Sequence, residues 1–563
     1  MRLDKVTLGS PKDSPTHRFK NLKNVTIDFD QDHWVTVVIG WNGTGKSNVL
    51  EAIAIIFRDL IAKKRMPEFV FQLAYRMGNG DATMHIHIDA DPDRKKEPFV
   101  IHVATDAEAR GEGTLISSFD DQEQISAKRG KKIKLTALHS DEHLYLPRYV
   151  FSYYSGESLR MHDVFRPYLE SYDNKLRNGE DPGLKRLFYA MPVHSQFVLL
   201  AFLIQQSDVV RTFLDKHLGL DPDEGIESVL FVIRQPPWKS KASDGDPRFW
   251  NARGVVRDFL ARLYDIALAP IEISRRISTS IWNKQTLQFK YLYVKDIGAL
   301  RRLVGDQAPA QFFRDLESTH VSELIEEVRI RVRLKKNDSS VTFRELSEGE
   351  QQLLTVLGLL RFTAENESLF LLDEPDTHLN PRWCVDYLNY LKSFVGHHSD
   401  ARDNSHIVLT THNPLAIAEL VKEQVQILYR EPEAHSVIAE NPAVDPKGMG
   451  FAGIVTSDMF GLGSSLDKPT NDDLLALHQL STKAQATLSA PDRAKLAEIR
   501  ERLKGLDFNF ASRDRLEQEY LRARFDLASD APIDGAIVTP ENKERALGAL
   551  VQSLLHRLRE DEG

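Results

Sequence analysis

The chain has 563 residues, of which 42% are hydrophobic and 28% charged, and this composition is typical of a folded protein without long disordered regions. A chain of this length is expected to form roughly three to four domains. The formal net charge of −9 excludes a strong overall attraction to nucleic acids or anionic membranes, so any such contact must come from a local patch. The single cysteine, Cys384, excludes an internal disulfide framework and a cysteine-based zinc cluster.

Neither a secretory signal nor a membrane span is visible. Residues 1–17 are polar and charged, and the longest apolar block, Phe197–Ile204, is too short to cross a bilayer. We therefore expect a cytoplasmic protein without membrane contact.

The first strong signal is a phosphate-binding loop. The apolar run Trp34–Ile39 predicts a buried strand, and it leads directly into Gly40-Trp41-Asn42-Gly43-Thr44-Gly45-Lys46-Ser47 and a helical pattern. Glycines let backbone N–H groups approach phosphate oxygens, and the helix N-terminus adds partial positive charge. Lys46 is expected to reach the terminal phosphates and Ser47 to bind magnesium. The predicted nucleotide-binding residues here are Gly40, Asn42, Gly43, Thr44, Gly45, Lys46, Ser47 and Asn48.

A β-rich lobe follows the loop helix. The helix places apolar residues from Val49 to Ile61 on one face. Alternating apolar residues in 84–88 and 99–103, separated by a charged turn, then predict an antiparallel hairpin. Residues 105–140 are polar and predict a surface loop or loosely structured insertion.

The middle of the chain, from 160 to about 320, is mostly helical in pattern. Its clearest segments are 195–206 and 255–268, and Pro236-Pro237 breaks the pattern. No heptad repeat persists over three or four cycles, so we expect a compact helical insertion and not a long coiled coil.

Strand alternation returns near Val328–Leu334 and Val341–Phe343. A strongly apolar helix then opens at Leu346-Ser347-Glu348-Gly349-Glu350. Ser347 is placed to cap this helix, and Gly349 is expected to leave its backbone open to an anion.

Two apolar strands downstream end in polar residues. The strand at 369–372 ends in Asp373 and Glu374, and we expect Asp373 to hold magnesium while Glu374 polarises the attacking water. The strand at 407–410 leads into His412, which is placed to touch a terminal phosphate.

Beyond residue 430, charged segments around 491–503, 512–526 and 540–559 predict helices.

This ordered set of motifs resembles the ATP-binding-cassette (ABC) ATPases, in the soluble branch that includes SMC, RecF and OLD-type proteins. The motifs cover about residues 1–60 and 340–420. The resemblance implies an α/β fold: an ABC-ATPase head, built as a phosphate-loop mixed sheet with an antiparallel β lobe, that carries a compact helical insertion and a helical C-terminal region. The implied domains are 1–155, the N-terminal part of the head; 156–322, the helical insertion; 323–430, the C-terminal part with signature, Walker B strand and switch histidine; and 431–563, an α-rich region for partner or oligomer contacts.

The resemblance also implies a site shared between two heads, with ATP and Mg²⁺ as cofactors. One subunit would supply catalytic Lys46, Glu374 and His412 and the metal ligands Ser47 and Asp373. The other would supply the nucleotide-binding signature residues Ser347, Gly349 and Glu350, with Asp376–Asn380 as the D-loop at the seam. Two features depart from the family pattern: Glu348 stands within the signature, and no Q-loop glutamine is evident where Tyr154-Ser155-Gly156-Glu157 lies.

Within this branch, Tyr-Ser-Gly after an aromatic strand, Ser-Glu-Gly-Glu-Gln, and Asp-Glu-Pro-Asp-Thr-His-Leu-Asn-Pro are similar to the PtuA family, the ATPase subunits of Septu-type and retron-associated antiphage systems. That similarity implies an ATPase regulatory or sensor subunit, a homodimer or higher oligomer, an HNH nuclease partner like PtuB, and DNA contact through the complex. No Toprim-like nuclease motif can be placed in 430–563, so we expect no intrinsic nuclease.

The alternative is a RecF- or SMC-like DNA-repair clamp that acts directly on DNA. Arg329, Arg331, Arg333 and Lys335 lie on one face of a predicted strand, and Lys128–Lys132 lie in a predicted loop, so both groups could meet phosphates. The other interpretation of both groups is a solvated face or an ion-pair network.

Overall fold

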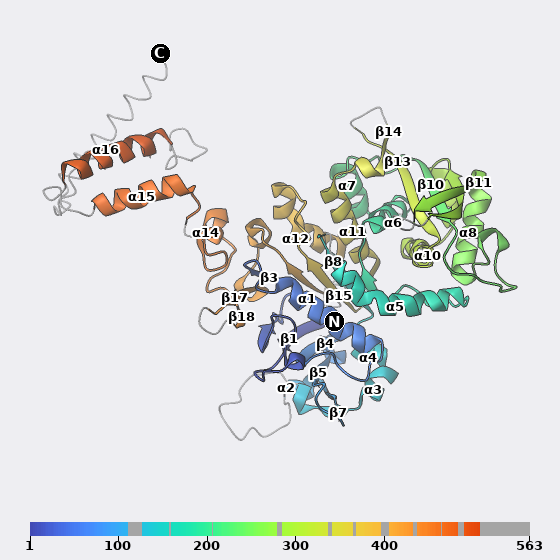
Figure 1. Cartoon of the computed structure of the whole chain (residues 1–563), viewed down its shortest axis with the longest axis horizontal. Coiled ribbons are helices and arrows are strands. Elements are labelled where there is room, and N and C mark those ends of the chain that lie inside the picture. Colours follow the sequence, from blue (N-terminus) through green and yellow to red (C-terminus); the bar gives the residue numbers. More distant parts are fainter. Residues whose placement is uncertain are drawn as a thin grey trace, which may run out of the picture. The chain divides into compact units, whose positions relative to one another are not determined.

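The computed structural model describes residues 1–110, 127–156, 159–204, 206–278, 284–335, 340–363, 367–395, 405–431, 436–462, 464–481 and 489–506. The chain divides into two compact units, Met1–Gly461 and Leu462–Gly563. The first unit contains three sheets and the helices that pack on them (Figure 1).

A seven-stranded sheet forms the centre of the first unit. Its strand order is β18 (Val437–Glu440), β17 (Val425–Arg430), β3 (Val35–Gly40), β16 (Ser405–Thr410), β15 (Ser368–Asp373), β8 (Tyr149–Tyr154) and β9 (Leu187–Tyr189). All neighbours pair in parallel except β18. The strands β15 and β16 are buried along their whole length, as expected for parallel strands covered on both faces. Because β3, β15 and β16 run the same way, the loops that follow them meet at one edge.

A second sheet is antiparallel and has six strands. Its order is β2 (Val25–Asp28), β1 (Arg2–Leu8), β4 (Phe71–Met77), β5 (Met84–Ala90), β6 (Phe99–Thr105) and β7 (Lys131–Ile133). The predicted hairpin is the β5–β6 pair.

The prediction of an irregular loop at 105–140 is wrong for the described part of that segment. It contains α2 (Asp106–Arg110), β7 and α3 (Leu135–Ser140), followed by α4 (Glu142–Tyr145). The backbone packs closely against β6 at Gly130, where a Cβ would lie 2.1 Å from the Val103 carbonyl oxygen. Ala104, Ala109 and Ala127 form a small buried cluster beside it. The segment thus packs on the sheet through glycine and alanine, and these few small residues do not stand out in a polar sequence. The polar composition therefore led to the wrong prediction of a loop.

The helix after the phosphate loop, α1 (Lys46–Ile61), is buried on almost every side. It packs in one core with residues of the antiparallel sheet and with Val38, Leu369 and Val408 of the central sheet. The sequence predicted that only one face of this helix would be buried. Burial between two sheets explains why Ala52, Ala54 and Ile55, which lie off that face, are also apolar.

The opposite face of the central sheet carries a second core. It is covered by α6 (Pro192–Ile204), α11 (Glu348–Thr363) and α12 (Pro381–Val395). The helix α5 (Arg160–Arg177) contributes to both cores, with its C-terminal part in this one. Helices α6 and α11 approach closely at Gly358, where a Cβ would lie 2.1 Å from a methyl carbon of Val198.

The sequence pattern predicted a mostly helical insertion, and this prediction is wrong. It contains a five-stranded antiparallel sheet in the order β11 (Leu268–Ser278), β12 (Lys284–Val294), β10 (Ile226–Arg234), β13 (Ile325–Arg333) and β14 (Ser340–Thr342). The helices α7 (Asp208–Lys216), α8 (Gly254–Ile266), α9 (Ile297–Val304) and α10 (Pro309–Val321) lie between these strands in sequence. The β-branched run in β10 supplies the central strand, and its tertiary pairing decides the conformation.

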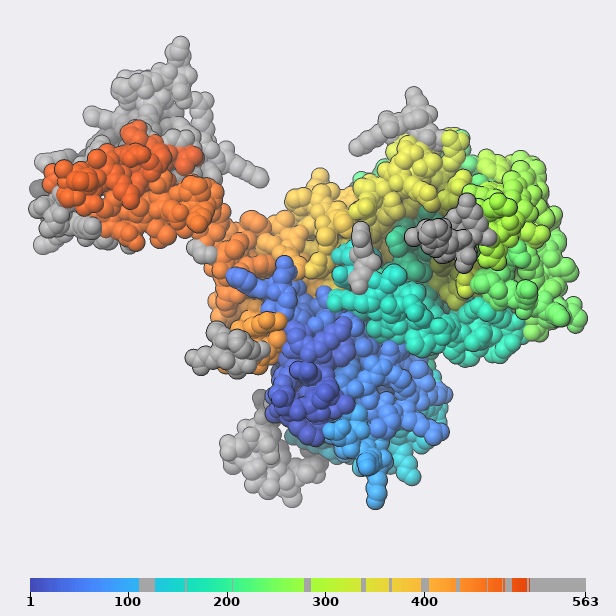
Figure 2. Space-filling model, in the orientation of Figure 1, coloured from blue at the N-terminus to red at the C-terminus, as the bar shows by residue number. Residues whose placement is uncertain are grey.

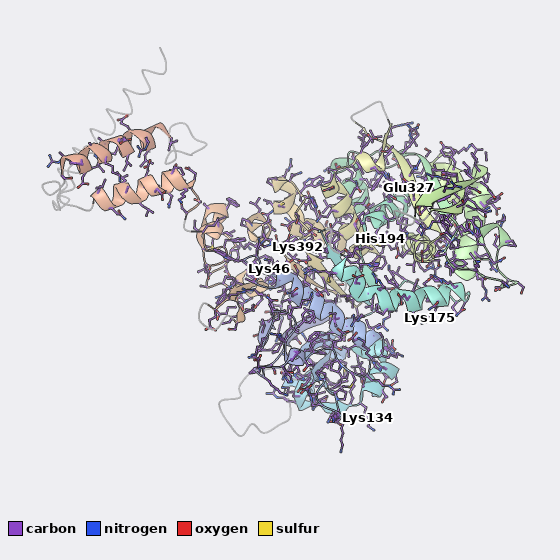
Figure 3. The ribbon with its side chains drawn as sticks, viewed as in Figure 1. Lys46, Lys134, Lys175, His194, Glu327 and Lys392 are labelled. Atoms are coloured by element: carbon purple, nitrogen blue, oxygen red, sulfur yellow. The ribbon has the colours of Figure 1, made fainter. Side chains whose placement is uncertain are left out.

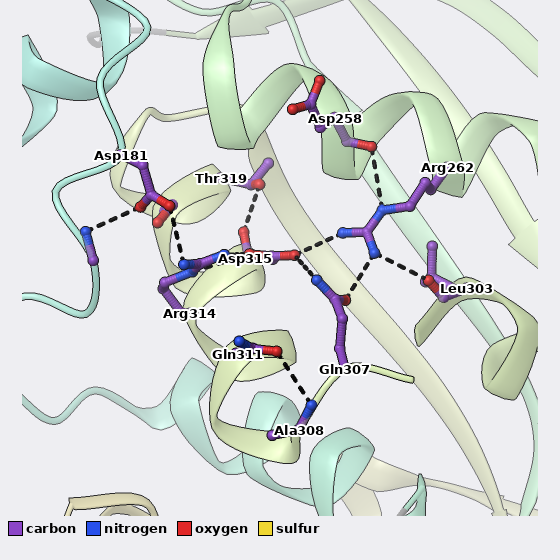
Figure 4. Close-up of polar contacts among 12 residues, drawn as sticks. Asp181, Asp258, Arg262, Leu303, Gln307, Ala308, Gln311, Arg314, Asp315 and Thr319 are labelled. Carbon is purple, nitrogen blue, oxygen red and sulfur yellow. Dashed lines mark hydrogen bonds and ion pairs between the residues drawn. The ribbon is translucent and has the colours of Figure 1, made fainter. Parts of the chain in front are cut away.

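A buried carboxylate joins several elements of the insertion (Figure 4). Asp315 on α10 is 1% exposed and accepts hydrogen bonds from Arg262 of α8 (2.7 Å), Gln307 (3.1 Å) and Arg314 (2.9 Å). Arg314 also pairs with Asp181, which lies in the connection between α5 and β9. Such a charge stays buried because its lone pairs are satisfied.

The first unit ends with α14 (Gly450–Thr456), so it extends beyond the predicted boundary at residue 430. The second unit contains α15 (Lys468–Ser481) and α16 (Ala490–Gly505), which agrees with the predicted helical segment at 491–503. The helical segments predicted at 512–526 and 540–559 lie outside the described residues.

No single helix among the described residues is long and apolar enough to cross a membrane. One strongly bent pair, α6 with α7, passes that test by length and composition when its two parts are taken together.

Candidate functional site

The phosphate-binding loop connects β3 to α1, as predicted. Gly40, Gly43 and Gly45 all have positive φ, at 145°, 81° and 105°. Gly40 has a second constraint, since a Cβ there would lie 2.2 Å from the carbonyl oxygen of Leu428 on β17. The left-handed backbone needed for the loop therefore coincides with a close approach between strands.

Lys46 is the first residue of α1, and its side chain is 6% exposed. Figure 3 labels Lys46 in the whole molecule. The Lys46 ammonium donates hydrogen bonds to the carbonyl oxygens of Gly40 (2.8 Å) and Trp41 (3.3 Å), inside the loop. Burial lowers the pKa of Lys46, while the nearby carboxylates of Glu374 and Asp373 act in the opposite direction. The ammonium thus lies between the loop and the acidic residues, where a terminal phosphate would be held.

Side chains outside the motif hold the loop in shape. Asn48, predicted to bind nucleotide, donates to the side-chain oxygen of Asn21 (2.6 Å), and Asn21 donates to the carbonyl oxygen of Thr44 (3.0 Å). Arg430, the last residue of β17, donates to the Gly43 carbonyl oxygen (3.1 Å). Asn21 and Arg430 were not predicted, because each lies far from the motif in sequence and only the fold brings it there.

The two predicted metal ligands are in contact. The Ser47 hydroxyl donates a 3.0 Å hydrogen bond to Oδ1 of Asp373, which is 1% exposed at the end of β15. Thr410, at the end of β16, donates to the same oxygen. A hydroxyl and a carboxylate are the oxygen ligands that Mg²⁺ prefers, so this pair fits a magnesium ion bound together with substrate phosphates.

Glu374 and His412 are also brought together. Nε2 of His412 lies 2.7 Å from Oε1 of Glu374, and this hydrogen bond holds the pKa of Glu374 below its usual value. Glu374 has φ 52°, an uncommon value for a side chain other than glycine, and its N–H donates to the Thr410 carbonyl oxygen (3.0 Å). A strained backbone that is fixed by its neighbours is common at catalytic sites. The predicted base is therefore ionised and held in place by the predicted switch histidine.

The predicted D-loop begins with a buried acid. Asp376 is 4% exposed, and its two carboxylate oxygens share the hydrogen of the Thr411 hydroxyl, whose oxygen lies 2.8 and 3.0 Å from them. Burial raises the pKa of Asp376. Since Thr411 directly precedes His412, this contact links the D-loop to the switch histidine.

The signature segment is capped as predicted. Ser347 accepts from the N–H of Glu350 (3.3 Å), and Glu350 Oε2 accepts from the Ser347 N–H (2.7 Å) and hydroxyl (2.8 Å). This reciprocal pair is a capping box. Within one chain, Glu350 therefore orients the start of α11, while its predicted contact with ATP of a second head stays a prediction.

Gly349 differs from the expectation of an open backbone. It is buried, and a Cβ there would lie 2.4 Å from the His378 carbonyl oxygen. His378 also pairs with Glu348, at 3.3 Å. Gly349 thus lets the D-loop pack directly on the signature helix.

Arg160 is the main site residue that the sequence did not reveal. It is the first residue of α5, and its guanidinium donates to Oδ2 of Asp373 (3.1 Å) and lies 5.0 Å from the ring centre of Tyr154. It also lies 3.9 Å from Glu51 of α1. It follows the segment assigned to the missing Q-loop, of which Glu157 lies outside the described residues. The only sequence signal for this role of Arg160 was its position shortly after Tyr-Ser-Gly at the end of a strand.

The two basic groups considered for DNA differ from each other. On β13, Arg329, Arg331 and Arg333 are exposed on one face, as predicted. Arg329 pairs with Glu327 (2.8 Å), Arg333 with Glu224 (3.4 Å) and Lys335 with Asp215 (2.6 Å), as the ion-pair interpretation expects. The segment Lys128–Lys132 is partly the edge strand β7, where Lys132 pairs with Glu97 at 2.7 Å.

Two family models match the chain. Residues 18–154 match the family described as an AAA ATPase domain, and residues 234–418 match an AAA domain family named for the AbiEii toxin of type IV toxin–antitoxin systems. The two matches contain the phosphate loop and the segment from β13 to His412.

Curated relatives point to the same class. The chain is 30% identical over 125 residues to the Septu protein PtuA of Bacillus mycoides (strain KBAB4), a match that covers 21% of this chain and 16% of the relative. It is 24% identical over 155 residues to the "Retron Vc95 probable ATPase" of Vibrio cholerae serotype O1 biovar El Tor, covering 25% of this chain and 27% of the relative. The matches thus span less than a third of either relative. The chain carries an ABC-like ATPase domain and is similar to PtuA.

Two solved structures are similar to this chain at low scores. The SMC head domain from Thermotoga maritima has a TM-score of 0.30 and 14% identity, and the match covers 79% of this chain and 100% of that one. The structure of Stu0660 of Streptococcus thermophilus has a TM-score of 0.26 and 12% identity, with coverage of 91% and 95%. Neither match bears on the function.

Proposed function

We propose that this chain hydrolyses ATP and acts as the regulatory or sensor subunit of an antiphage defence complex. In this proposal, ATP closes two heads into a dimer, hydrolysis opens them, and the cycle controls an associated HNH-type nuclease. The observation that carries the ATPase part is the convergence of Lys46, Ser47, Asp373, Glu374 and His412, from three parallel strands, at one edge of the central sheet.

The chemistry follows from the side chains at that edge. Lys46 would leave the loop carbonyls and bind the terminal phosphates, where its charge offsets the charge of the transferred group. Ser47 and Asp373 would hold a magnesium ion, which neutralises phosphate charge when bound. Glu374 is ionised and would orient a water molecule for attack on the γ-phosphorus and accept its proton. The bond between the γ-phosphorus and the bridging oxygen breaks, and ADP and phosphate result.

His412 holds the Glu374 carboxylate in the described structure and keeps it ionised. A histidine that donates to the base can also donate to a phosphate oxygen, so its position depends on whether the γ-phosphate is present. Through Thr411 and Asp376, this change would reach the D-loop and the signature helix of the same chain. A second head that contacts those elements could thereby sense hydrolysis.

The ATPase part is tested with Glu374→Gln. We expect this substitution to lower the steady-state rate of Mg²⁺-dependent ATP hydrolysis by about 100-fold or more, the scale of general-base catalysis, while a fluorescent ATP analogue still binds. The matched control is Glu170→Gln, an exposed acid on α5 that should leave the rate unchanged. Equal rates for Glu374→Gln and the control would disprove the assigned role.

The regulatory part is tested in cells that carry the neighbouring genes. We expect a tagged Glu374→Gln chain, slowed in hydrolysis, to co-purify with a nuclease subunit and to alter resistance to phage. If it captured no nuclease and its cells stayed fully resistant, the regulatory role would be abandoned, although ATP hydrolysis by the purified chain could still stand.

A further inference from the structure

The five-stranded sheet of the insertion has one covered face and one open face. Val229, Phe231 and Ile233 of β10 point into the main core, where residues of α8, α9 and α10 pack against them. On β13 the burial alternates, so that Ile330 and Val332 are covered while Arg329, Arg331 and Arg333 are exposed. These arginines therefore lie on the side of the sheet that the helices leave free. The sheet is the green to yellow region of Figure 1, and Figure 2 shows the same region in space-filling form.

Strand register places aromatic residues in the same rows as the charged ones. Leu230 of β10 is paired with Tyr293 of β12 on one side and with Arg329 of β13 on the other. In the next row of this face, Val232 is paired with Tyr291 and Glu327. Directly paired residues point to the same face of a sheet, so the tyrosines and arginines share the open face.

The charge of this face is positive. Glu327 pairs with Arg329 (2.8 Å) and Arg344 (2.7 Å), and Arg275 of β11 also interacts with it electrostatically. One carboxylate thus lies among three guanidinium groups. Arg331 makes no ion pair with any residue in the described part of the chain, although it interacts electrostatically with Glu345. The ion-pair network on this face is therefore incomplete, and positive charge is left over.

Aromatic and apolar side chains are exposed beside the arginines. Tyr293 is 39% exposed. Arg275 lies 5.3 Å from the ring centre of Phe289 and donates to the Tyr291 hydroxyl at 2.9 Å. Ile271 and Ile273 of β11 are 54% and 46% exposed. Planar guanidinium and phenol groups thus lie next to each other on a partly apolar surface, beneath which the ring of Phe289 is buried.

We propose that this open sheet face binds single-stranded nucleic acid, with its arginines on phosphates and its tyrosines against bases. Guanidinium groups recognise phosphate oxygens, and exposed aromatic rings on a sheet stack with bases that are not paired. Duplexes hide those base faces, so the tyrosines favour a single strand. Because the chain has a net charge of −9, it does not attract nucleic acid as a whole, and the attraction must come from this local patch.

A protein strand added to the sheet edge is the competing occupant, and the structure disfavours it. Of the two edge strands, β11 contains Pro270, which has no N–H to donate, and the charged pair Arg275-Arg276, while β14 is only three residues long. Proline and charge are the features that protect sheet edges from pairing with other strands. The proposal goes beyond the ATPase function and does not rest on it, because this face includes none of the residues at the ATP site.

The test measures fluorescence anisotropy of a labelled oligothymidine of about 20 nucleotides, longer than a typical binding site of one such surface. It uses the full chain and the double variant Arg329→Gln/Arg331→Gln. We expect the variant to raise the Kd about tenfold or more and to lower the salt dependence of log Kd by about 1.4, the contribution of two phosphate contacts on a single strand. The substitution Tyr293→Ala should weaken binding at least about fivefold, as expected for one stacked base.

The matched control is Arg301→Gln/Arg302→Gln, which removes two exposed arginines from α9 on the covered side of the sheet. It should leave the Kd within about twofold, which allows for a small general charge effect. Unchanged ATP hydrolysis and thermal unfolding of all variants would show that they are folded. An RNA of the same length tests the sugar, and a duplex of the same sequence tests the preference for a single strand.

Several results would overturn the proposal. One is a wild-type chain that binds no oligonucleotide even at low salt, and another is equal weakening of binding by both double variants. A preference for the duplex would reject the stacking part. Binding of poly-glutamate with the same arginine dependence, and no binding of oligonucleotide, would assign the face to an acidic protein partner.

Discussion

At the scale of single residues, the Asp373 carboxylate shows how the site is built. It accepts hydrogen bonds from Ser47, Thr410 and Arg160, which belong to α1, β16 and α5. The sequence predicted Ser47, because the phosphate-loop motif fixes the role of its last residue. Thr410 and Arg160 carry no motif of their own and become partners of Asp373 only when β15, β16 and α5 assemble.

The role of Arg160 can be tested with Arg160→Met, which keeps the length of the aliphatic stem. A hydrogen bond to a charged group contributes about 1.5–3 kcal/mol, so we expect the maximal rate of ATP hydrolysis to fall about tenfold or more. The Mg²⁺ concentration that gives half the maximal rate should also fall, because Asp373 no longer shares its charge with a guanidinium. Both quantities come from rates measured over a series of Mg²⁺ concentrations.

Arg166→Met is the control for this experiment, because Arg166 is exposed on the same helix and pairs with Asp163. If Arg160→Met and the control shared the same maximal rate and the same Mg²⁺ dependence, Arg160 would have no part in positioning Asp373.

At the scale of elements, the central sheet was predictable and the insertion was not. The strands β3, β15 and β16 are continuous apolar runs followed by motif residues, so their type and their common edge follow from the sequence. The insertion sheet has weaker signals. Its strand β12 alternates Leu287, Phe289 and Tyr291 against polar neighbours, a pattern typical of a strand, but most of its outer neighbour β11 is exposed on both faces. An edge strand that is exposed on both faces shows little alternation of apolar and polar residues. The helical patterns before and after these strands therefore determined the prediction for the whole insertion.

The contact between α6 and the signature helix α11 depends on Gly358. Its missing side chain leaves room for Val198, whose methyl carbons would lie 2.1 and 2.5 Å from a Cβ at this position. We expect Gly358→Ala to lower the free energy of unfolding by about 1–3 kcal/mol, the usual cost of overpacking, although alanine is otherwise favoured over glycine in a helix by about 1 kcal/mol. Urea unfolding followed by circular dichroism measures this change.

The double variant Gly358→Ala/Val198→Ala provides the matched comparison, since it removes the methyl groups that clash. It should recover part of the lost stability and show coupling between the two sites. A single variant that is as stable as the wild type would mean that the helices can move apart without cost.

At the scale of the whole molecule, one buried charged cluster joins the central sheet to the insertion. Lys185 pairs with Glu317 of α10, and His194 of α6 donates to the other oxygen of Glu317 at 2.7 Å. All three side chains are at most 1% exposed. Although burial alone would raise it, the charge of Lys185 and the hydrogen bond from His194 hold the pKa of Glu317 well below its usual value. Removing one partner would leave a buried charge uncompensated, so this cluster ties α6 and α10 together.

His194 and the neighbouring His320, whose ring centres lie 6.4 Å apart, make stability depend on pH. Burial lowers the pKa of His194, and it lowers the pKa of His320 from 6.5 to about 4. Between these two values the unfolded chain binds a proton at residue 320 that the folded chain does not. Stability is therefore highest above about pH 6.5 and falls as the pH drops toward 4. For His320 alone we expect a loss of about 2 kcal/mol at pH 5 relative to pH 7.5.

The measurement is urea unfolding at pH 7.5 and pH 5 for the wild type and for His320→Gln, which cannot titrate in this range. The variant should have a smaller difference in unfolding free energy between the two pH values, by about 2 kcal/mol, whatever its stability at pH 7.5. Asn174→Gln serves as the control, because Asn174 is exposed on α5 and neither side chain titrates, so the difference should stay unchanged. If His320→Gln kept the full pH dependence of the wild type, other groups would be responsible for it, and His320 would have to titrate in the folded chain much as it does in the unfolded one.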